Sequence, residues 1–187
     1  MEHQPAYPSR FHMLSDLFAQ AGITALLAGG YAVNAHKFSR QTDDIDFVLR
    51  ADDASRIDAG MARQGYSVLA KNPVFVRYAS PAPFERIIDF LFVDGGTFEK
   101  MAADSQTIVI AGRPFRVLSL MHLIAMKLHA LKFGDRRREA KDLLDVVELA
   151  RMNSVDVASD GFKAWCLKYG NADILERIRS LAGKREA

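Results

Sequence analysis

In the first third of the chain, segments whose apolar residues recur at helical spacing are followed by segments with the spacing of a strand. Phe11, Leu14 and Leu17 recur at helical spacing, and Ser9 and Gly22 are of the types that begin and stop a helix. The pattern therefore predicts a helix over residues 9–21. The runs that follow predict a short strand over residues 25–28, a short helix over 31–37, a strand over 44–49 and a helix over 51–64.

The rest of the chain divides into a strand-rich middle and a helical end. Residues 66–70 and 74–79 predict paired strands around a Lys-Asn-Pro turn, and residues 84–93 predict a long apolar strand that Asp-Gly-Gly closes. Residues 106–118 predict a hairpin that turns at Ala111-Gly112. Helical spacing then continues over residues 120–133, 137–151, 160–168 and 171–182.

This order of elements predicts an α/β (α+β) fold, with a mixed sheet flanked by helices and a helical C-terminal extension. We expect residues 1–118 to form the core and residues 119–187 to pack on it as one globular unit. A chain of 187 residues that is 49% hydrophobic is long and apolar enough for one domain of ordinary size.

Composition also narrows the environment of the protein. The chain contains no run of eighteen apolar residues, and its start carries Glu2 and two prolines where a secretion signal would be apolar. A single cysteine, Cys166, fits a reducing compartment, so we expect a cytoplasmic protein that does not contact membranes. Residues 1–112 carry 10 basic and 13 acidic side chains, whereas residues 113–187 carry 15 basic and 10 acidic ones. This uneven distribution suits a metal site beside a phosphate-bearing substrate. The alternative is an ordinary solvated surface.

Two carboxylates interrupt the predicted strand over residues 44–49. Because side chains alternate along a strand, Asp44 and Asp46 lie on one face while the residues between them point into the core. Two such charges, about 7 Å apart by the rise of a strand, repel each other unless a cation lies between them. Mg²⁺ binds carboxylate and phosphate oxygens together, so the pair predicts a metal site for phosphoryl chemistry. The alternative is a strand end whose acids face water.

Two glycines precede this strand. Gly29 and Gly30 lie between a predicted strand and a predicted helix, where glycine allows a tight turn and a close approach of the backbone to a phosphate. The alternative is a plain turn between strand and helix.

A third carboxylate lies in a later apolar strand. Asp89 stands within Ile-Ile-Asp-Phe-Leu-Phe, and charged residues are rarely buried without a partner. If this strand lies beside residues 44–49, we expect Asp89 to complete a metal-binding triad. Pairing with Arg86 or Arg116 is the alternative.

Together these features resemble the DNA-polymerase-β-like nucleotidyltransferase superfamily over residues 25–93. The resemblance implies a nucleotidyltransferase fold and two divalent ions, Mg²⁺ or Mn²⁺, held by Asp44, Asp46 and Asp89. It also implies that Asp89 activates the acceptor hydroxyl, which attacks the α-phosphate of an NTP and displaces pyrophosphate.

The flanking residues resemble one group of this superfamily. Ser-Arg-Gln-Thr-Asp-Asp-Ile-Asp over residues 39–46 is similar to the Arg-x-Thr-x-Asp-Ile-Asp of AbiEii-type toxin nucleotidyltransferases, with Asp43 as an added acid. Residues 126–149 resemble the group's second signature, a lysine on one helix and Lys-Asp-x-x-Asp on the next. The resemblance makes Arg138 a candidate and implies nucleotide binding by Gly29, Gly30, Arg40, Thr42, Lys127, Lys141 and Asp142.

Helical spacing leaves other roles open for the second signature. Lys127 lies on an apolar stripe, so its amine either extends to water or meets an anion such as a triphosphate. Arg138–Asp142 and Lys141–Asp145 are spaced as i,i+4 surface ion pairs, and for Lys141–Asp145 the surface pair is the preferred interpretation.

The sequence thus predicts a metal-dependent nucleotidyltransferase that moves NMP from an NTP to an acceptor hydroxyl. By resemblance the acceptor is RNA, specifically tRNA, in a toxin or defence enzyme with a cognate antitoxin as a candidate partner. The basic run at residues 136–138 would then contact RNA phosphates. One alternative is an antibiotic-modifying nucleotidyltransferase, which needs an acidic pocket for a cationic drug. Another is a catalytically silent binding module, against which three intact carboxylates argue.

Overall fold

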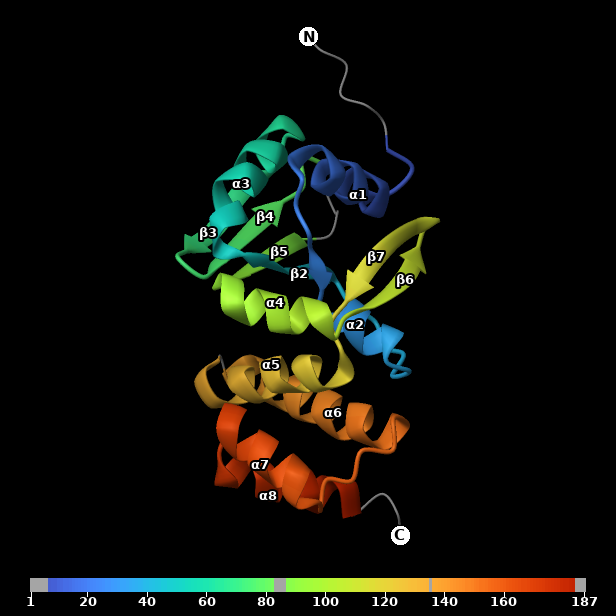
Figure 1. Cartoon of the computed structure of the whole chain (residues 1–187), viewed down its shortest axis with the longest axis vertical. Helices are drawn as coiled ribbons and strands as arrows, with labels where there is room; N and C mark the ends of the chain where they lie inside the picture. The colour runs from blue at the N-terminus through green and yellow to red at the C-terminus, as the bar shows by residue number, and fades with distance from the viewer. Residues whose placement is uncertain (1–6, 83–86, 135, 184–187) are drawn as a thin grey trace. The chain divides into compact units, whose positions relative to one another are not determined.

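The computed structural model describes residues 7–82, 87–134 and 136–183 of the chain (Figure 1). The chain divides into two compact units. Unit 1 comprises residues 1–32 and 41–119, and unit 2 comprises residues 33–40 and 120–187. The contacts group the segment 33–40 with unit 2. The division of the chain after residue 118 stays a prediction. That the two parts pack as one globular unit stays a prediction.

Unit 1 is built on a mixed sheet. Among the described residues it has seven strands in the order β3-β4-β5-β2-β1-β7-β6. β2 runs parallel to β5 and β1 parallel to β7, whereas the other neighbours are antiparallel. The strands are β1 Leu26–Leu27, β2 Asp44–Arg50, β3 Ser67–Asn72, β4 Phe75–Ala79, β5 Ile87–Val93, β6 Gln106–Ile110 and β7 Arg113–Val117. The predicted mixed sheet is confirmed, and residues 84–86 of the predicted strand 84–93 lie outside the described residues.

The first helices begin and end close to where their sequences predict. α1 spans Arg10–Ala21; the Ser9 side chain accepts a hydrogen bond from the His12 N–H, and Gly22 ends the helix with a φ of 61°. α2 spans Gly29–Ala35, and α3 spans Ala54–Arg63 after a short 3₁₀ turn. The predicted helices over residues 9–21, 31–37 and 51–64 are therefore present.

One helix was missing from the prediction. α4 spans Gly95–Ala103, where the pattern suggested only the end of a strand. The side chain of Asp94 caps the helix, because its Oδ1 accepts a hydrogen bond from the Thr97 N–H at 2.9 Å. Phe98 is buried on the side of the helix that packs against β2. Gly95 and Gly96 do not favour a helix, so the sequence pattern did not predict one here. Asp94 is a favourable N-cap residue and is the signal that predicts this helix.

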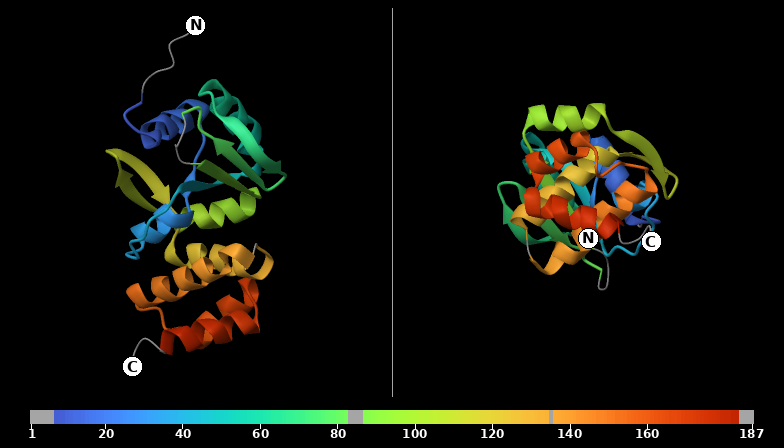
Figure 2. Two further views of the ribbon diagram at one scale, coloured as in Figure 1. Left: turned by 180° about the vertical axis from the view of Figure 1, so that it is seen from behind. Right: turned by 90° about the horizontal axis from the view of Figure 1, so that it is seen from below.

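The core of unit 1 lies between α1 and one face of the sheet. The Phe18 ring lies 5.0 Å from that of Phe47, which stacks on Phe90 at 6.1 Å between ring centres. The odd-numbered residues of β2 therefore face this core, as alternation predicts. α4 packs against β2 from the other face, where the Arg50 guanidinium lies 5.2 Å from the centre of the Phe98 ring. Figure 2 shows α1 and α4 on opposite sides of the sheet.

Both predicted hairpins are present. β3 pairs with β4 and β6 with β7, in each case antiparallel. Ala111 and Gly112 join β6 to β7 with φ of 50° and 76°, the left-handed conformation that a tight two-residue hairpin turn requires.

Unit 2 is helical in its C-terminal part. α5 Leu120–Phe133, α6 Arg136–Met152, α7 Asp160–Tyr169 and α8 Ala172–Gly183 match the four predicted helices, each bound to within about a residue. Leu128, Val146 and Ile178 are fully buried among them. In the described parts of the chain, none of the helices combines the length and apolarity that crossing a membrane demands.

Candidate active site

The register of β2 and β5 brings the predicted carboxylates together. Asp46 is the in-register neighbour of Asp89 in this parallel pair. Asp44 lies two residues before Asp46, on the same face of β2. Residues paired in register on adjacent strands point to the same side of a sheet, so all three carboxylates lie on one face. The two strands are neighbours, as the interpretation of Asp89 required.

These carboxylates differ in their contact with water. Asp89 is buried, with 1% of its surface exposed, whereas Asp44 and Asp46 are half-buried. Burial of like charges costs free energy unless opposite charge lies close to them.

An arginine of β4 supplies that opposite charge. Arg77 pairs in register with Asp89; its Nε donates to Oδ1 at 2.9 Å and its Nη2 to Oδ2 at 2.6 Å. The hydrogen bond to Asp89 raises the pKa of Arg77 against the opposing effect of burial, and the negative charges of Asp89, Asp44 and Asp46 add to the increase. The guanidinium thus responds to all three carboxylates.

Arg77 was not among the partners that the sequence suggested for Asp89. Arg116 instead donates from Nε to the Ser105 Oγ at 2.9 Å, and Arg86 lies outside the described residues. Only the register between β4 and β5 places Arg77 beside Asp89, and hydrophobic patterning does not contain that register.

Gly29 holds the backbone directly against Asp46. Its φ is +54°, and a Cβ at this position would lie 1.8 Å from the Asp46 Oδ2. The N–H of Ala28 donates to the main-chain carbonyl of Asp46 at 2.8 Å. Both the conformation and the close approach require glycine, so this turn fixes the position of the Asp46 carboxylate. Gly30 follows it and is buried.

The donor set is chemically suited to a divalent cation. Carboxylate oxygens are the ligands that Mg²⁺ prefers, and the register of β2 and β5 brings three carboxylates to one face of the sheet. Within the described ranges, however, no group of three or more His, Cys, Asp or Glu side chains is arranged to hold a metal ion. Arg77 takes up both oxygens of Asp89, the most buried of the three carboxylates. The residue types therefore fit a metal, and a guanidinium stands beside the third carboxylate.

Thr42 stabilises the start of β2. It is buried, and its Oγ1 donates to the main-chain carbonyl of Asp44 at 3.3 Å. This contact supports the strand end that carries Asp44.

Unit 2 holds a buried network of charged residues. Arg40 donates from Nε and Nη2 to the two carboxylate oxygens of Asp145, at 2.6 and 2.7 Å. The Nζ of Lys127 lies 2.8 Å from the Asp145 Oδ2 and also donates to Asp142. Asn34 exchanges two hydrogen bonds with the main chain of Arg40, at 2.9 and 3.0 Å. The segment 33–40 is thereby attached to α5 and α6.

The preferred surface-pair interpretation of Asp145 is wrong. Asp145 is fully buried, whereas Lys141 is exposed, and the partners of Asp145 are Arg40 and Lys127. Burial acts to raise the pKa of Asp145, but hydrogen bonds and charge from Arg40 and Lys127 outweigh it and hold that pKa below its usual value.

Lys127 meets an anion, as one interpretation of its apolar stripe required. In the structure, the anions that pair with the Lys127 amine are the carboxylates of Asp142 and Asp145. Arg138 and Lys141 are exposed on α6. The structure thus brings Arg40, Lys127 and Asp142 together in unit 2, while it brings Gly29 and the three carboxylates together in unit 1. Nucleotide binding by the unit 2 residues stays a prediction.

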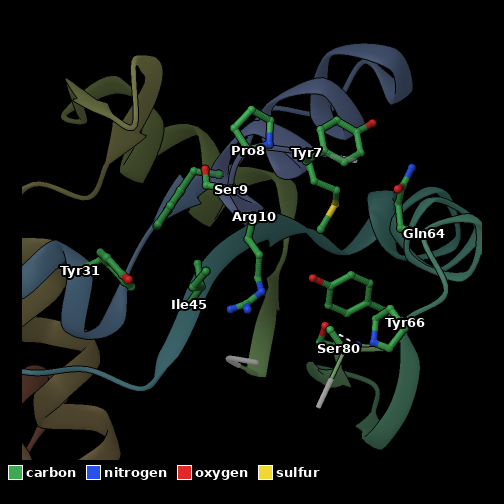
Figure 3. A pocket seen from close by; sticks show the side chains of 13 residues that line it. Tyr7, Pro8, Ser9, Arg10, Tyr31, Ile45, Gln64, Tyr66 and Ser80 are labelled. Carbon is green, nitrogen blue, oxygen red and sulfur yellow. Dashed lines mark hydrogen bonds between the residues drawn. The ribbon is translucent and has the colours of Figure 1, made fainter. Parts of the chain in front are cut away.

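A pocket of about 510 Å³ opens on the other side of β2 (Figure 3). Ile45, whose side chain points away from the carboxylate face, lines it together with Tyr7, Tyr31 and Tyr66. Arg10 is the charged residue among its described lining residues, which include no carboxylate. Among the described residues, the charge at this pocket is therefore the positive one of Arg10.

Comparison with known proteins shows the family and the fold to which this chain is similar. The family model described as "Nucleotidyl transferase AbiEii toxin, Type IV TA system" matches residues 13–186. The solution structure of the antibiotic-resistance factor ANT(2'')-Ia is similar, with a TM-score of 0.61 and 16% identity over 94% of this chain and 95% of that one. The lincomycin-bound lincosamide antibiotic adenylyltransferase LnuA has a TM-score of 0.55 and 15% identity over 80% of this chain and 99% of its own. At such identities the likeness shows a shared fold. Among curated proteins, none matches the chain.

Proposed function

The chain belongs to the AbiEii nucleotidyl transferase toxin family and is a nucleotidyltransferase, and from this premise we propose that it moves NMP from an NTP to a hydroxyl of RNA, specifically tRNA. The observation that carries the proposal is the register of Asp46 with Asp89, which places three carboxylates on one face beside Gly29. Because the family is described as the toxin of a type IV toxin–antitoxin system, we propose a cognate antitoxin as a partner.

We propose that Asp44, Asp46 and Asp89 hold two divalent ions, Mg²⁺ or Mn²⁺. When bound, such ions lower the pKa of an attacking hydroxyl and stabilise the charge on a leaving pyrophosphate. The support for this assignment is the donor set on one sheet face and the close packing of Gly29 against the Asp46 carboxylate, which holds that carboxylate in place.

The chain's own residues would orient the reacting groups. Gly29 and the hydrogen bond from Ala28 hold Asp46 in one position. Asp89, the most buried of the three carboxylates, would accept the proton of the acceptor hydroxyl. The acceptor oxygen then bonds to the α-phosphorus as the bond from that phosphorus to pyrophosphate breaks. The roles in nucleotide binding that the resemblance implies remain part of the proposal for each of these residues: Gly29, Gly30, Arg40, Thr42, Lys127, Lys141 and Asp142.

Transfer to an antibiotic is the second candidate function. ANT(2'')-Ia, described as an antibiotic-resistance factor, resembles nearly the whole length of this chain, and LnuA is described as an antibiotic adenylyltransferase. The lack of a carboxylate among the described residues that line the 510 Å³ pocket argues against a cationic drug at that place.

One labelling experiment separates these functions. The chain is incubated with Mg²⁺ and each α-³²P NTP in turn, together with either total RNA or a panel of antibiotics. Label on RNA with the wild type, and none with Asp46→Asn, supports the proposal. Label on a drug and none on RNA would replace it with the second candidate.

A further inference from the structure

Arg77 pairs with a carboxylate of the proposed metal site, although the proposed reaction gives it no role. Its guanidinium takes up both oxygens of Asp89, and its side chain is 30% exposed whereas that of Asp89 is 2% exposed. The guanidinium carbon also lies 5.6 Å from the centre of the Phe75 ring. Phe75 precedes Arg77 by two residues and therefore shares its face of β4.

We propose that Arg77 is an exchangeable counter-cation of the active site. In the metal-free protein it neutralises Asp89, and it releases this carboxylate when a divalent cation binds to the aspartates. Arg77 would thus set the metal concentration at which the site becomes complete. The inference rests on the proposed function, because it assumes that the three carboxylates bind metal.

The charges on this face support competition. Asp44, Asp46 and Asp89 share one face, and on it the Arg77 guanidinium already occupies both oxygens of Asp89. A guanidinium and a divalent cation on the same carboxylate repel each other strongly at such short range. A metal ion can therefore bind the oxygens of Asp89 only if the guanidinium leaves them.

The surroundings of Arg77 also allow it to leave Asp89. Its side chain already reaches water, so a released guanidinium is solvated without the cost of a buried charge. The face of the Phe75 ring offers it a second favourable contact. The exchange therefore needs a side-chain rotation and no change in the sheet.

Mn²⁺ affinity of the full chain tests the proposal directly. Free Mn²⁺ is measured by electron paramagnetic resonance for the wild type, Arg77→Met and Arg77→Lys. We expect Arg77→Met, which removes the competing charge, to bind Mn²⁺ about tenfold more tightly. Arg77→Lys keeps the charge and loses the two-pronged geometry, so its affinity should lie between the other two. The rise in melting temperature on adding Mn²⁺ should follow the same order.

Arg56→Met is the matched control. Arg56 also pairs with a buried aspartate of unit 1, Asp53, whose side chain is 3% exposed. Its substitution should leave the Mn²⁺ affinity unchanged, which excludes a general effect of net charge.

Two outcomes would overturn the ideas separately. If the wild type binds Mn²⁺ and Arg77→Met binds it no more tightly, Arg77 is a structural partner of Asp89. If Arg77→Met does not fold, wild-type affinity in Arg77→Lys overturns the exchange. If Asp46→Asn binds Mn²⁺ as tightly as the wild type, the carboxylates are not the metal site, and the proposed function fails instead.

Discussion

Gly29 and Gly112 both adopt a positive φ, +54° and +76°. Of these two glycines, Gly29 has the Asp46 carboxylate at the place of a Cβ, whereas Gly112 has no atom within 4 Å of that place. Gly112→Ala should therefore destabilise the protein by about 1 kcal/mol through backbone strain alone, with transfer activity retained. Gly29→Ala adds a collision with the Asp46 carboxylate, so we expect a larger loss of stability and loss of transfer. Thermal unfolding and NMP labelling of RNA measure both effects. Equal behaviour of the two variants would show that Gly29 does not position Asp46.

The three carboxylates should differ in their contribution to stability while sharing the loss of activity. Asp46→Asn removes one of several like charges, so the metal-free protein should keep or slightly gain stability. Asp89→Asn breaks the paired hydrogen bonds to Arg77 and should cost about 1–3 kcal/mol. Both variants should lose transfer. Urea unfolding in the presence of a chelator checks this order, and marked destabilisation by Asp46→Asn would make Asp46 a structural partner.

For single residues, the sequence shows which acids interrupt an apolar pattern. It does not show which side chains form ion pairs with these acids. Asp44, Asp46 and Asp89 are recognisable because each interrupts a run of strand-forming residues. Arg77 lies in a half-exposed strand where an arginine is ordinary, so nothing local distinguishes it from a surface residue. Its role depends on a strand register that only the folded sheet defines.

Among the elements, regular spacing and capping residues decide what can be predicted. The helices of unit 2 follow an uninterrupted helical period, and the tight hairpin at Ala111-Gly112 carries its turn residues in the sequence. α4 escaped prediction because Gly95 and Gly96 open it, although Asp94 provides a cap. Asp145 was misjudged because i,i+4 spacing describes neighbours on one helix, whereas its partners come from α5 and from Arg40.

The network around Asp145 should make the stability of unit 2 sensitive to acid. Its partners lower the pKa of Asp145 below the ordinary value, so the charged form stabilises the folded state. This contribution is complete above about pH 4, the unfolded pKa, and is lost as the pH falls towards the folded pKa.

Asp145→Asn tests this contribution. At pH 7 it leaves Arg40 with a neutral partner and should cost about 3 kcal/mol or more, the range for breaking a buried ion pair. The decline in stability below pH 4 should become shallower than in the wild type. Lys141→Ala, at the exposed position four residues earlier, should change stability by no more than about 0.5 kcal/mol. Urea unfolding between pH 3 and 7 measures the free energy of unfolding of both variants. An equal loss of stability in Asp145→Asn and Lys141→Ala would show that the Asp145 carboxylate does not stabilise unit 2.

For the whole molecule, the organisation into two units was only partly visible in the sequence. The shift to helices near Leu118 is a local property of the sequence, since it depends only on the spacing of nearby apolar residues. The assignment of residues 33–40 to unit 2 depends on contacts across more than a hundred residues, such as Arg40 with Asp145 and Asn153 with the carbonyl of His36. Hydrophobic periodicity contains no information about such distant partners.

The structure also narrows the basic surface that the sequence suggested for RNA. Arg177 pairs with Glu139 at 2.6 Å, and the Arg179 Nε donates to the carbonyl of Val157 at 2.9 Å, so both take part in holding unit 2 together. Arg136 and Arg137 are exposed at the start of α6. Because both side chains are exposed, contact with RNA phosphates is tested at these two positions.

If the acceptor is RNA, the double variant Arg136→Glu with Arg137→Glu should label it more slowly than the wild type. Each neutralised phosphate releases condensed counterions, so removing two contacts should also flatten the dependence of binding on salt, by about 0.7 per contact for single strands. The matched control is Arg63→Glu with Lys100→Glu, which makes the same charge change at exposed positions of unit 1. Mn²⁺ binding should persist in both variants because neither touches the carboxylates. Filter binding and RNA labelling from low to high salt measure the effect. If the α6 variant labels RNA as fast as the control at every salt concentration, the start of α6 is not the RNA surface.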